Sequence, residues 1–384
     1  MQVIGNIVAA EPSVYLAPLR IKYLEILKNE ALAKNSGNFN KELQLDAKGR
    51  KIVKWWIHNI HAQYKDIVVE PPQVFLYTDA SLTGWGAKLG NVTTGGHWAK
   101  EEISHINTLE LKAMIMGLQS LCNDLCKTHI KIFTDNTTAK ACIEKCGSTH
   151  KHLLEITQEI YDWAMERKIH LSAGYIKGEE NIEADRESRI KNIDTEWMIK
   201  PHIFAKICEI FGSPNIDLFA TRINAQSHKY VSWKPDPYAL CTDAFSIAWT
   251  RDTYYAFPPF SLIGPVLKRL REEKTELLMV APLWPTASWF PALLRQICQD
   301  PVILPPNSLT LPQDPQRHHP LGNRLVLAGM KISGDPLRIK HYQMKLPPLC
   351  WAPGDMTLAN NIGHVSIDGC SFATNERLIH FNPL

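Results

Sequence analysis

Two kinds of hydrophobic spacing follow one another along the chain. Residues 12 to about 66 carry apolar side chains every three or four positions, in LRIKYLEILKNEAL and again in RKIVKWWIHNI, with the polar turn NSGNFNKE between them. This spacing predicts a small helical lead-in over 1–70. Pro71 and Pro72 end it, because proline cannot extend a helix, and strand-like runs begin at Val74.

Short apolar runs then alternate with helix-like segments. Strands are predicted over 74–80, 84–89, 96–98, 129–134 and 169–176, and helices over 107–121, 136–145, 152–167 and 182–189. Three strands followed by alternating helices and strands predict an α/β domain over 71–192, with a mixed five-stranded sheet and flanking helices.

Beyond Asp194 the chain becomes rich in proline and tryptophan. Apolar segments such as PNIDLFATRINA, YVSWKPDPY and LLMVAPLWP end in loops, which predicts a second α/β domain over 193–340. The remainder, 341–384, has little periodicity, and we expect a poorly specified tail there.

Composition narrows the class of protein only slightly. The 384 residues are 45% hydrophobic and 21% charged, as in ordinary globular proteins. The formal net charge of +3 is weakly basic, so binding of nucleic acid would need a local patch. None of the nine cysteines forms a C-x-x-C pair, which argues against a disulfide framework or structural zinc and favours a reducing compartment.

No segment predicts export or membrane insertion. The start, MQVIGNIVAAEPSVYLAPL, lacks a basic region followed by a long apolar core. The most apolar stretch, 277–294, is interrupted by three prolines and fits a buried strand with loops better than a membrane span. We expect no membrane partner and a location in the cytoplasm or nucleus, not secretion.

Four acidic residues lie at the edges of apolar segments: Asp79 in VFLYTDAS, Glu110 in INTLELKA, Asp135 in IKIFTDNT and Asp185 in NIEADRES. Carboxylates on one scaffold repel each other, and proteins usually keep such a cluster when divalent cations neutralise it. A two-metal phosphodiester hydrolase is the first hypothesis.

Each acid also has a simpler interpretation. Glu110 lies three residues after Asn107, where a capping-box glutamate belongs. Asp135 with its neighbour Asn136 could cap the next helix, and Asp185 could be an exposed helical acid paired with an arginine, either Arg186 or Arg189. The joint order of all four favours the metal site.

These motifs carry a resemblance to a known family. The stretch 79–189 resembles the ribonuclease H domain that follows reverse transcriptase in retrotransposons, especially DIRS-type elements with a tyrosine recombinase. The lead-in, with GNFN and KWWIHNI, resembles the segment that joins polymerase to ribonuclease H. No Tyr-x-Asp-Asp turn occurs upstream, so we expect a polyprotein fragment, a decayed copy or a co-opted piece, with a reverse transcriptase module as a candidate partner.

The resemblance implies hydrolysis of the RNA strand of an RNA–DNA hybrid with two Mg²⁺ or Mn²⁺ ions. It implies that Asp79 is shared by both ions, that Glu110 and Asp135 hold one, and that Asp185 holds the other. It also places substrate contacts at Ser81, Asn136 and Tyr175. Family members commonly have histidine at the last of these positions, and tyrosine, with a pKa near 10, cannot exchange protons near neutrality, so slow turnover is expected.

The segment 196–305 resembles the methyltransferase-like region of the same elements, which is similar to phage adenine-N6 DNA methyltransferases. Asp217 and the loop formed by Pro258, Pro259 and Phe260 match, in part, places that bind S-adenosylmethionine and the target base. Phe257 stands where Asn or Asp should accept the adenine amino group. A non-catalytic fold is favoured here, with DNA as a candidate partner.

The rival to a nuclease is a nucleic-acid-binding module that does not cleave. Lysines are dispersed across the first domain, and surface lysines usually only solvate a protein. The presence of all four acids favours the enzyme, whereas salt-sensitive hybrid binding without metal-dependent cleavage would indicate the module.

Overall fold

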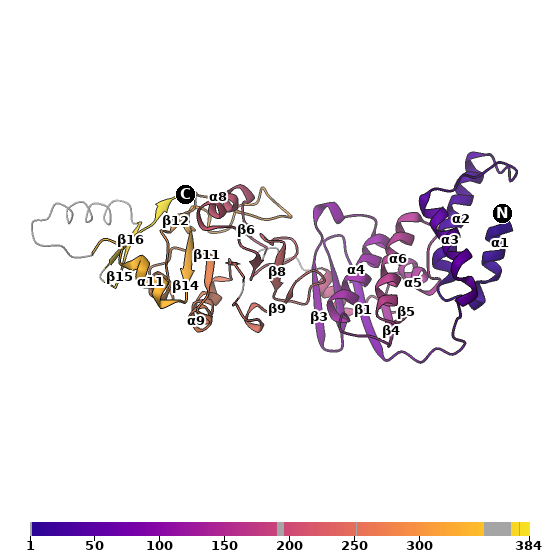
Figure 1. The fold of residues 1–384 in the computed structure, drawn as a ribbon, viewed down its shortest axis with the longest axis horizontal. Helices are drawn as coiled ribbons and strands as arrows, with labels where there is room; N and C mark the ends of the chain where they lie inside the picture. The colour runs from indigo at the N-terminus through magenta and orange to yellow at the C-terminus, as the bar shows by residue number, and fades with distance from the viewer. Residues whose placement is uncertain (1, 190–195, 251, 349–369, 376) are drawn as a thin grey trace, which may run out of the picture. The chain divides into compact units, whose positions relative to one another are not determined.

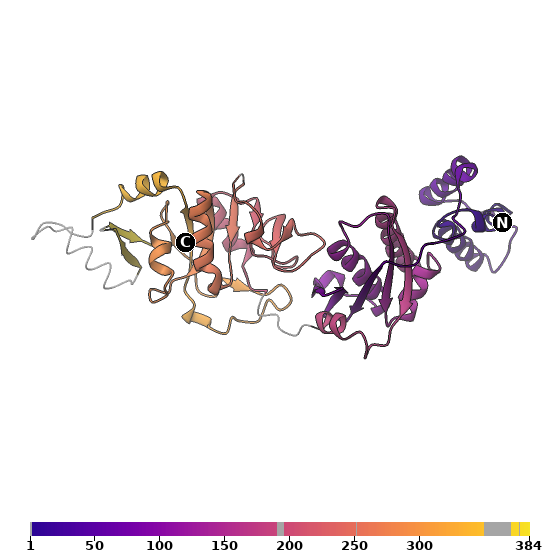
Figure 2. The same cartoon turned by 90° about the horizontal axis from the view of Figure 1, so that it is seen from below.

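The computed structural model describes residues 2–189, 196–250, 252–348, 370–375 and 377–384. The chain divides into two compact units, Met1–Lys191 and Asn192–Leu384, each of which is described by itself. The elements of each can be followed by colour in Figures 1 and 2. None of the helices in the described ranges is long and apolar enough to cross a membrane.

Unit 1 contains a five-stranded mixed sheet in the order β3-β2-β1-β4-β5. The first three strands pair antiparallel, and β4 and β5 continue in parallel from β1. The strands are β1 Val74–Ala80, β2 Gly84–Leu89, β3 Val92–His97, β4 His129–Thr134 and β5 His170–Tyr175. The helices that follow are α4 Ile106–Leu121, α5 Thr137–Glu144, α6 Lys151–Glu166 and α7 Ile182–Ser188. The mixed five-stranded sheet predicted from the sequence is therefore present.

The third strand differs from its prediction. It spans 92–97 rather than 96–98, because it pairs with β2 along its whole length after a turn at Gly90, whose φ is +58°. Threonines and glycines fill this strand, so it carries almost no apolar periodicity. Pairing with a neighbour, rather than its own pattern, makes it a strand.

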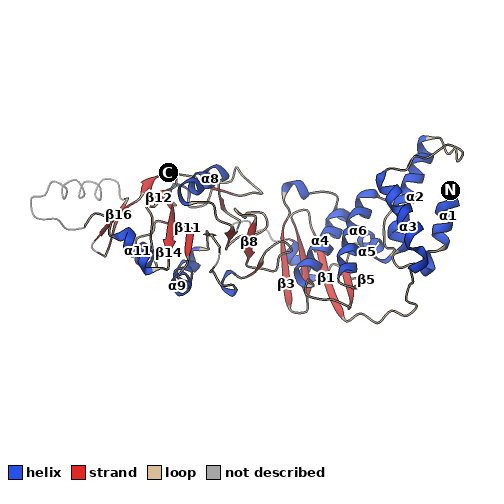
Figure 3. Ribbon diagram, viewed as in Figure 1, coloured by secondary structure: helices blue, strands red, loops and turns tan. Residues whose placement is uncertain are grey.

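Three helices precede the sheet: α1 Gln2–Ala9, α2 Ala17–Lys34 and α3 Ala47–Asn59 (Figure 3). The buried side chains of Leu19 and Tyr23, on α2, belong to the same hydrophobic core as Leu154 of α6. The predicted lead-in is helical. One side of α2 packs onto the α/β domain, while Ile21 and Leu24 form a smaller separate core with Ile7 of α1 and Trp56 of α3.

Helices α4 and α7 cover opposite faces of the sheet. Gly117 of α4 lies against Ala87 and Thr78, while a Cβ atom built on Gly86 would lie 2.1 Å from the carbonyl oxygen of Ala184 on α7. Successive side chains of a strand point to opposite faces. Glycine in β2 therefore allows α7 to approach the backbone of the sheet directly.

Gly86→Ala is expected to destabilise the chain by about 2–4 kcal/mol, because the added methyl group meets backbone atoms that cannot move without displacing α7. Urea denaturation followed by circular dichroism measures the change. Gly5→Ala is the matched control, since a Cβ at this helical glycine meets nothing within 4 Å and should be neutral or slightly stabilising. Equal effects of the two changes would refute the close approach.

Unit 2 contains an eight-stranded sheet in the order β17-β12-β14-β11-β10-β7-β8-β9. Strands β11, β10, β7, β8 and β9 run parallel, and β14 is antiparallel to both of its neighbours. The strands are β7 Ile216–Asp217, β8 Lys229–Ser232, β9 Cys241–Thr242, β10 Tyr254–Ala256, β11 Glu276–Pro282, β12 Val302–Ile303, β14 Leu327–Ser333 and β17 Asn382–Pro383. A separate two-stranded pair joins β6 Met198–Ile199 to β13 Leu309–Thr310.

Helices lie on both faces of this second sheet. Leu278 and Val280 of β11 share a core with α8 Pro201–Phe211, whereas Leu277 and Met279 share another with α9 Ile263–Glu273. Among the described residues, the other α-helices of unit 2 are α10 Phe290–Leu294 and α11 Pro336–Gln343. The continuous apolar run of β11 reflects burial on both faces.

The predicted tail is partly built into unit 2. Strands β15 Ser371–Thr374 and β16 Arg377–His380 form a hairpin, and β17 pairs with β12 of the main sheet. Phe381 is fully buried. These residues form strands instead of the expected unspecified tail. Strands of two to four residues are too short to show a local periodicity, so the pattern did not predict them; 349–369 lie outside the described residues.

Candidate metal centre

Three of the four predicted acids converge at one edge of the unit 1 sheet. Asp79 is near the end of β1, Asp135 directly follows the parallel neighbour β4, and Glu110 comes from α4. One carboxylate oxygen from each lies within 4.8 Å of the others. Asp79 and Glu110 are buried, at 2% and 3% exposure, and Asp135 is half-buried.

The register explains how side chains from both faces meet. Asp79 lies opposite Gly86 in the antiparallel pair, so both belong to the face that α7 covers. Thr134 and Glu110 approach from the α4 side, where the Thr134 hydroxyl donates to Glu110 Oε2 at 3.3 Å. The carboxylates thus meet around the ends of β1 and β4.

Burial and mutual repulsion make the carboxylates of Glu110 and Asp79 reluctant to ionise. Burial raises the pKa of Glu110 to about 8, and the charges of Asp79 and Asp135 add to the effect. Burial likewise raises the pKa of Asp79 to about 6, partly opposed by a hydrogen bond from Ser188. Three convergent oxygen donors with this charge repulsion fit a hard divalent cation such as Mg²⁺ or Mn²⁺.

Of the simpler interpretations, the capping box at Glu110 is wrong, and the cap at Asp135 and Asn136 holds for Asn136 alone. The N-cap of α4 is His105, whose Nδ1 accepts the backbone N–H of Asn107, so Glu110 is not a capping-box residue. The N-cap of α5 is Asn136, which accepts the backbone N–H of Ala139. The carboxylate of Asp135 is therefore not needed for capping.

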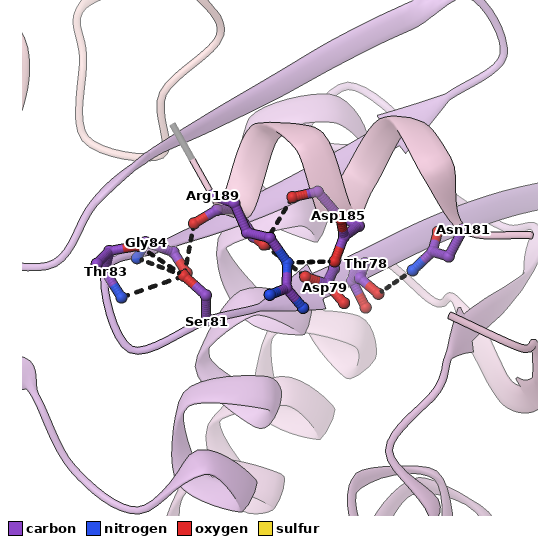
Figure 4. A network of polar contacts seen from close by, with 9 residues as sticks. Thr78, Asp79, Ser81, Thr83, Gly84, Asn181, Asp185 and Arg189 are labelled. Carbon is purple, nitrogen blue, oxygen red and sulfur yellow. Dashed lines mark hydrogen bonds and ion pairs between the residues drawn. The ribbon is translucent and has the colours of Figure 1, made fainter. Parts of the chain in front are cut away.

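The fourth acid is different. Asp185 Oδ1 accepts the Nε–H of Arg189 at 2.5 Å, and it does not belong to the group of three (Figure 4). Its charge is close enough to raise the pKa of Asp79. The arginine pairing considered from the sequence is thus present, and Asp185 lies beside the cluster with its own counter-ion.

The sequence did not single out Ser188 and Thr134. The Ser188 hydroxyl, which is buried, contacts Asp79 Oδ2 at 2.5 Å and the carbonyl oxygen of Asp185 at 2.9 Å. The spacing of Ser188 three residues after Asp185 could have indicated a shared helix face. Alternation along β4 places Thr134 on the face opposite to Phe133, toward α4.

The predicted substrate contacts have other roles in the free chain. Ser81 accepts the N–H groups of Thr83 and Gly84, and its hydroxyl contacts the Ser188 carbonyl oxygen at 2.6 Å, which fastens the β1–β2 turn to α7 (Figure 4). Besides capping α5, Asn136 donates to Asn107 Oδ1. Tyr175 is 52% exposed at the end of β5. Contact of these residues with substrate stays a prediction.

In unit 2 a cavity of about 750 Å³ lies at the carboxyl ends of β7, β8 and β10. The predicted loop of Pro258, Pro259 and Phe260 lines it, together with Phe257 and Trp233. Asp217 is not among its lining residues: the buried carboxylate accepts the N–H groups of Phe219 and Gln226, and burial raises its pKa to about 7. Asp217 shapes the loop beside the cavity.

No protein-family model matches the chain, and no curated protein matches it. Among solved structures, it is similar to RNase H1 from the halophilic archaeon Halobacterium salinarum NRC-1, with 17% identity over 30% of this chain and 92% of that one and a TM-score of 0.26. It is also similar to LC11-RNase H1 in complex with an RNA/DNA hybrid, with 19% identity over 30% of this chain and 93% of that one and a TM-score of 0.26. A foamy viral protease-reverse transcriptase in complex with dsDNA is similar with 10% identity over 40% of this chain and 34% of that one and a TM-score of 0.19. Similarity at this level says nothing about function, so any functional proposal must come from the carboxylate cluster itself.

Proposed function

We propose that unit 1 is a divalent-metal-dependent ribonuclease H that hydrolyses the RNA strand of RNA–DNA hybrids. The observation that carries the proposal is the convergence of Asp79, Glu110 and Asp135, with raised pKa values for the first two, at the edge of a β3-β2-β1-β4-β5 sheet. A protein gains no stability from this arrangement by itself, because the like charges repel.

The chain's own groups would hold and orient the cations. Asp79, Glu110 and Asp135 would hold them together, and Asp185 would contribute once it is released from Arg189. Ser188 fixes one oxygen of Asp79, and Thr134 fixes one of Glu110. When bound, the cations would activate water and stabilise the leaving oxygen. Binding them requires Glu110 and Asp79, whose pKa values are raised, to lose their protons.

Cleavage of labelled duplexes tests the proposal. An RNA–DNA hybrid, an RNA–RNA duplex and a DNA–DNA duplex are incubated with the full chain in Mg²⁺ and then in Mn²⁺. Metal-dependent cutting of only the RNA strand of the hybrid supports the ribonuclease H. Salt-sensitive binding of the hybrid with no cutting in either metal would instead support the non-cleaving module.

A specific observation favours a second function, in unit 2. Strands β7, β8 and β9 succeed one another toward one edge of the sheet, whereas β10 and β11 lie on the other side of β7. The strand order reverses between β7 and β10, and α/β proteins bind ligands at the carboxyl ends of strands beside such a point. The cavity lies there, and its volume is within the usual range for small-ligand sites.

We infer that this cavity binds S-adenosylmethionine without methyl transfer, because the ring of Phe257 cannot accept a hydrogen bond from an amino group. Aromatic rings of Phe219, Phe245 and Trp233 line it and offer surfaces for a heteroaromatic ring.

Trp233→Ala is expected to weaken S-adenosylmethionine binding at least about fivefold in calorimetry, through loss of a stacking surface. Tyr238→Ala is the matched control, because this similarly exposed aromatic residue does not line the cavity. Lack of binding by the unaltered chain, or methylation of adenine in DNA, would contradict the inference.

A further inference from the structure

We propose that the guanidinium of Arg189 takes the place of a second cation beside Asp185, so that the free chain binds one divalent ion and a second ion must displace this side chain. The inference rests on the proposed metal centre and adds an order of binding to it. The pair is direct: Arg189 Nε lies 2.5 Å from Asp185 Oδ1 (Figure 4).

The wider charges also act on Arg189. Its hydrogen bond and ion pair with Asp185 raise the pKa of the guanidinium, and the charges of Asp79 and Asp135 add to this. The guanidinium therefore neutralises part of the field of the same cluster that would attract the ions. A second divalent ion approaching Asp185 would be repelled by the positive charge of this guanidinium.

The side chain of Arg189 can move away from Asp185 without any movement of its backbone. Arg189 is the C-cap of α7, and its N–H bonds to the carbonyl oxygen of Asp185. The preceding residue, Ser188, is tied by its carbonyl oxygen to Ser81 and by its hydroxyl to Asp79. By contrast, the Arg189 side chain is 63% exposed. Exposed ion pairs four residues apart on a helix are weak, so an ion or a bound phosphate could displace the guanidinium.

The same helix provides a matched control. Arg186 is 70% exposed and pairs with Glu187 at 3.6 Å rather than with Asp185. Arg186→Gln and Arg189→Gln therefore remove the same charge from one short helix, and only the second frees Asp185. An effect of net charge alone would be equal in the two variants.

Binding of Mn²⁺ to the full chain without nucleic acid, followed by electron paramagnetic resonance, tests the proposal. The unaltered chain should bind one ion tightly and a second weakly. Arg189→Gln should strengthen the second step at least about tenfold, whereas Arg186→Gln should leave both steps unchanged. Because both arginines are exposed, circular dichroism should show the same fold for all three chains.

Two other results are informative. Two ions of similar affinity in the unaltered chain, or equal effects of the two arginine substitutions, would overturn the role of Arg189 while leaving the metal centre in place. Absence of bound Mn²⁺, or binding that Asp79→Asn does not weaken, would overturn the metal centre itself.

Discussion

Asp79→Asn is expected to reduce cleavage of the RNA strand of a hybrid by at least about a thousandfold. Asp79 is buried, and one of its carboxylate oxygens lies within 4.8 Å of those of Glu110 and Asp135, so the substitution removes a charged ligand from within the cluster. Asparagine is neutral and offers one oxygen ligand instead of two. Single-turnover cleavage in Mg²⁺, with products separated on a denaturing gel, measures the loss.

The control for this substitution is Asp124→Asn, which makes the same chemical change at an exposed residue after α4. It should keep the full rate. Mg²⁺ should also raise the melting temperature of the unaltered chain and of the control, but not that of Asp79→Asn. If Asp79→Asn retained more than about a tenth of the rate, Asp79 would not be a metal ligand in the reaction.

Without divalent metal, the stability of the chain should fall as the pH rises from about 4.5 to 8. The pKa of Glu110 is raised from 4.5 to about 8 in the folded state, so the folded chain binds the proton more tightly than the unfolded chain. The contribution of Glu110 to the free energy of unfolding therefore decreases across this window and is constant outside it. We expect a loss on the order of 2–4 kcal/mol, less than the shift alone implies, because the neighbouring carboxyl groups titrate together.

Glu110→Gln should remove the part of this loss that Glu110 contributes, leaving that of Asp79 and Asp217, and make the metal-free chain more stable than the original at pH 8. The amide can still accept the hydrogen bond that Thr134 donates, but it has no charge to bury. Urea denaturation in EDTA at pH 5 and pH 8 measures both effects. Glu159→Gln, on the exposed side of α6, is the control and should change neither value. A variant less stable than the original at pH 8 would mean that Glu110 is a structural residue.

The sequence predicted the neighbours of Asp79 better than those of Asp185. The strands that end in TDA and TDN were predicted with correct bounds for β1 and β4, because their apolar runs are buried on a sheet and bounded by polar residues. Parallel neighbours end at the same edge of a sheet, so the meeting of Asp79 and Asp135 was implicit in the predicted order. The partner of Asp185 was not, since the sequence left Arg186 and Arg189 open and only the structure pairs it with Arg189.

The sequence by itself determined the mixed sheet of unit 1, its helical lead-in and the four candidate acids, because these depend on local periodicity and residue type. Only the tertiary structure decided that Glu110 faces the cluster instead of capping its helix, that Ser188 holds Asp79, and that Asp217 lies behind its cavity rather than in it. It also decided the strands of two to four residues in unit 2. Such short strands form because they pair with other strands and are buried. The spacing of apolar residues along the chain predicts neither the pairing nor the burial.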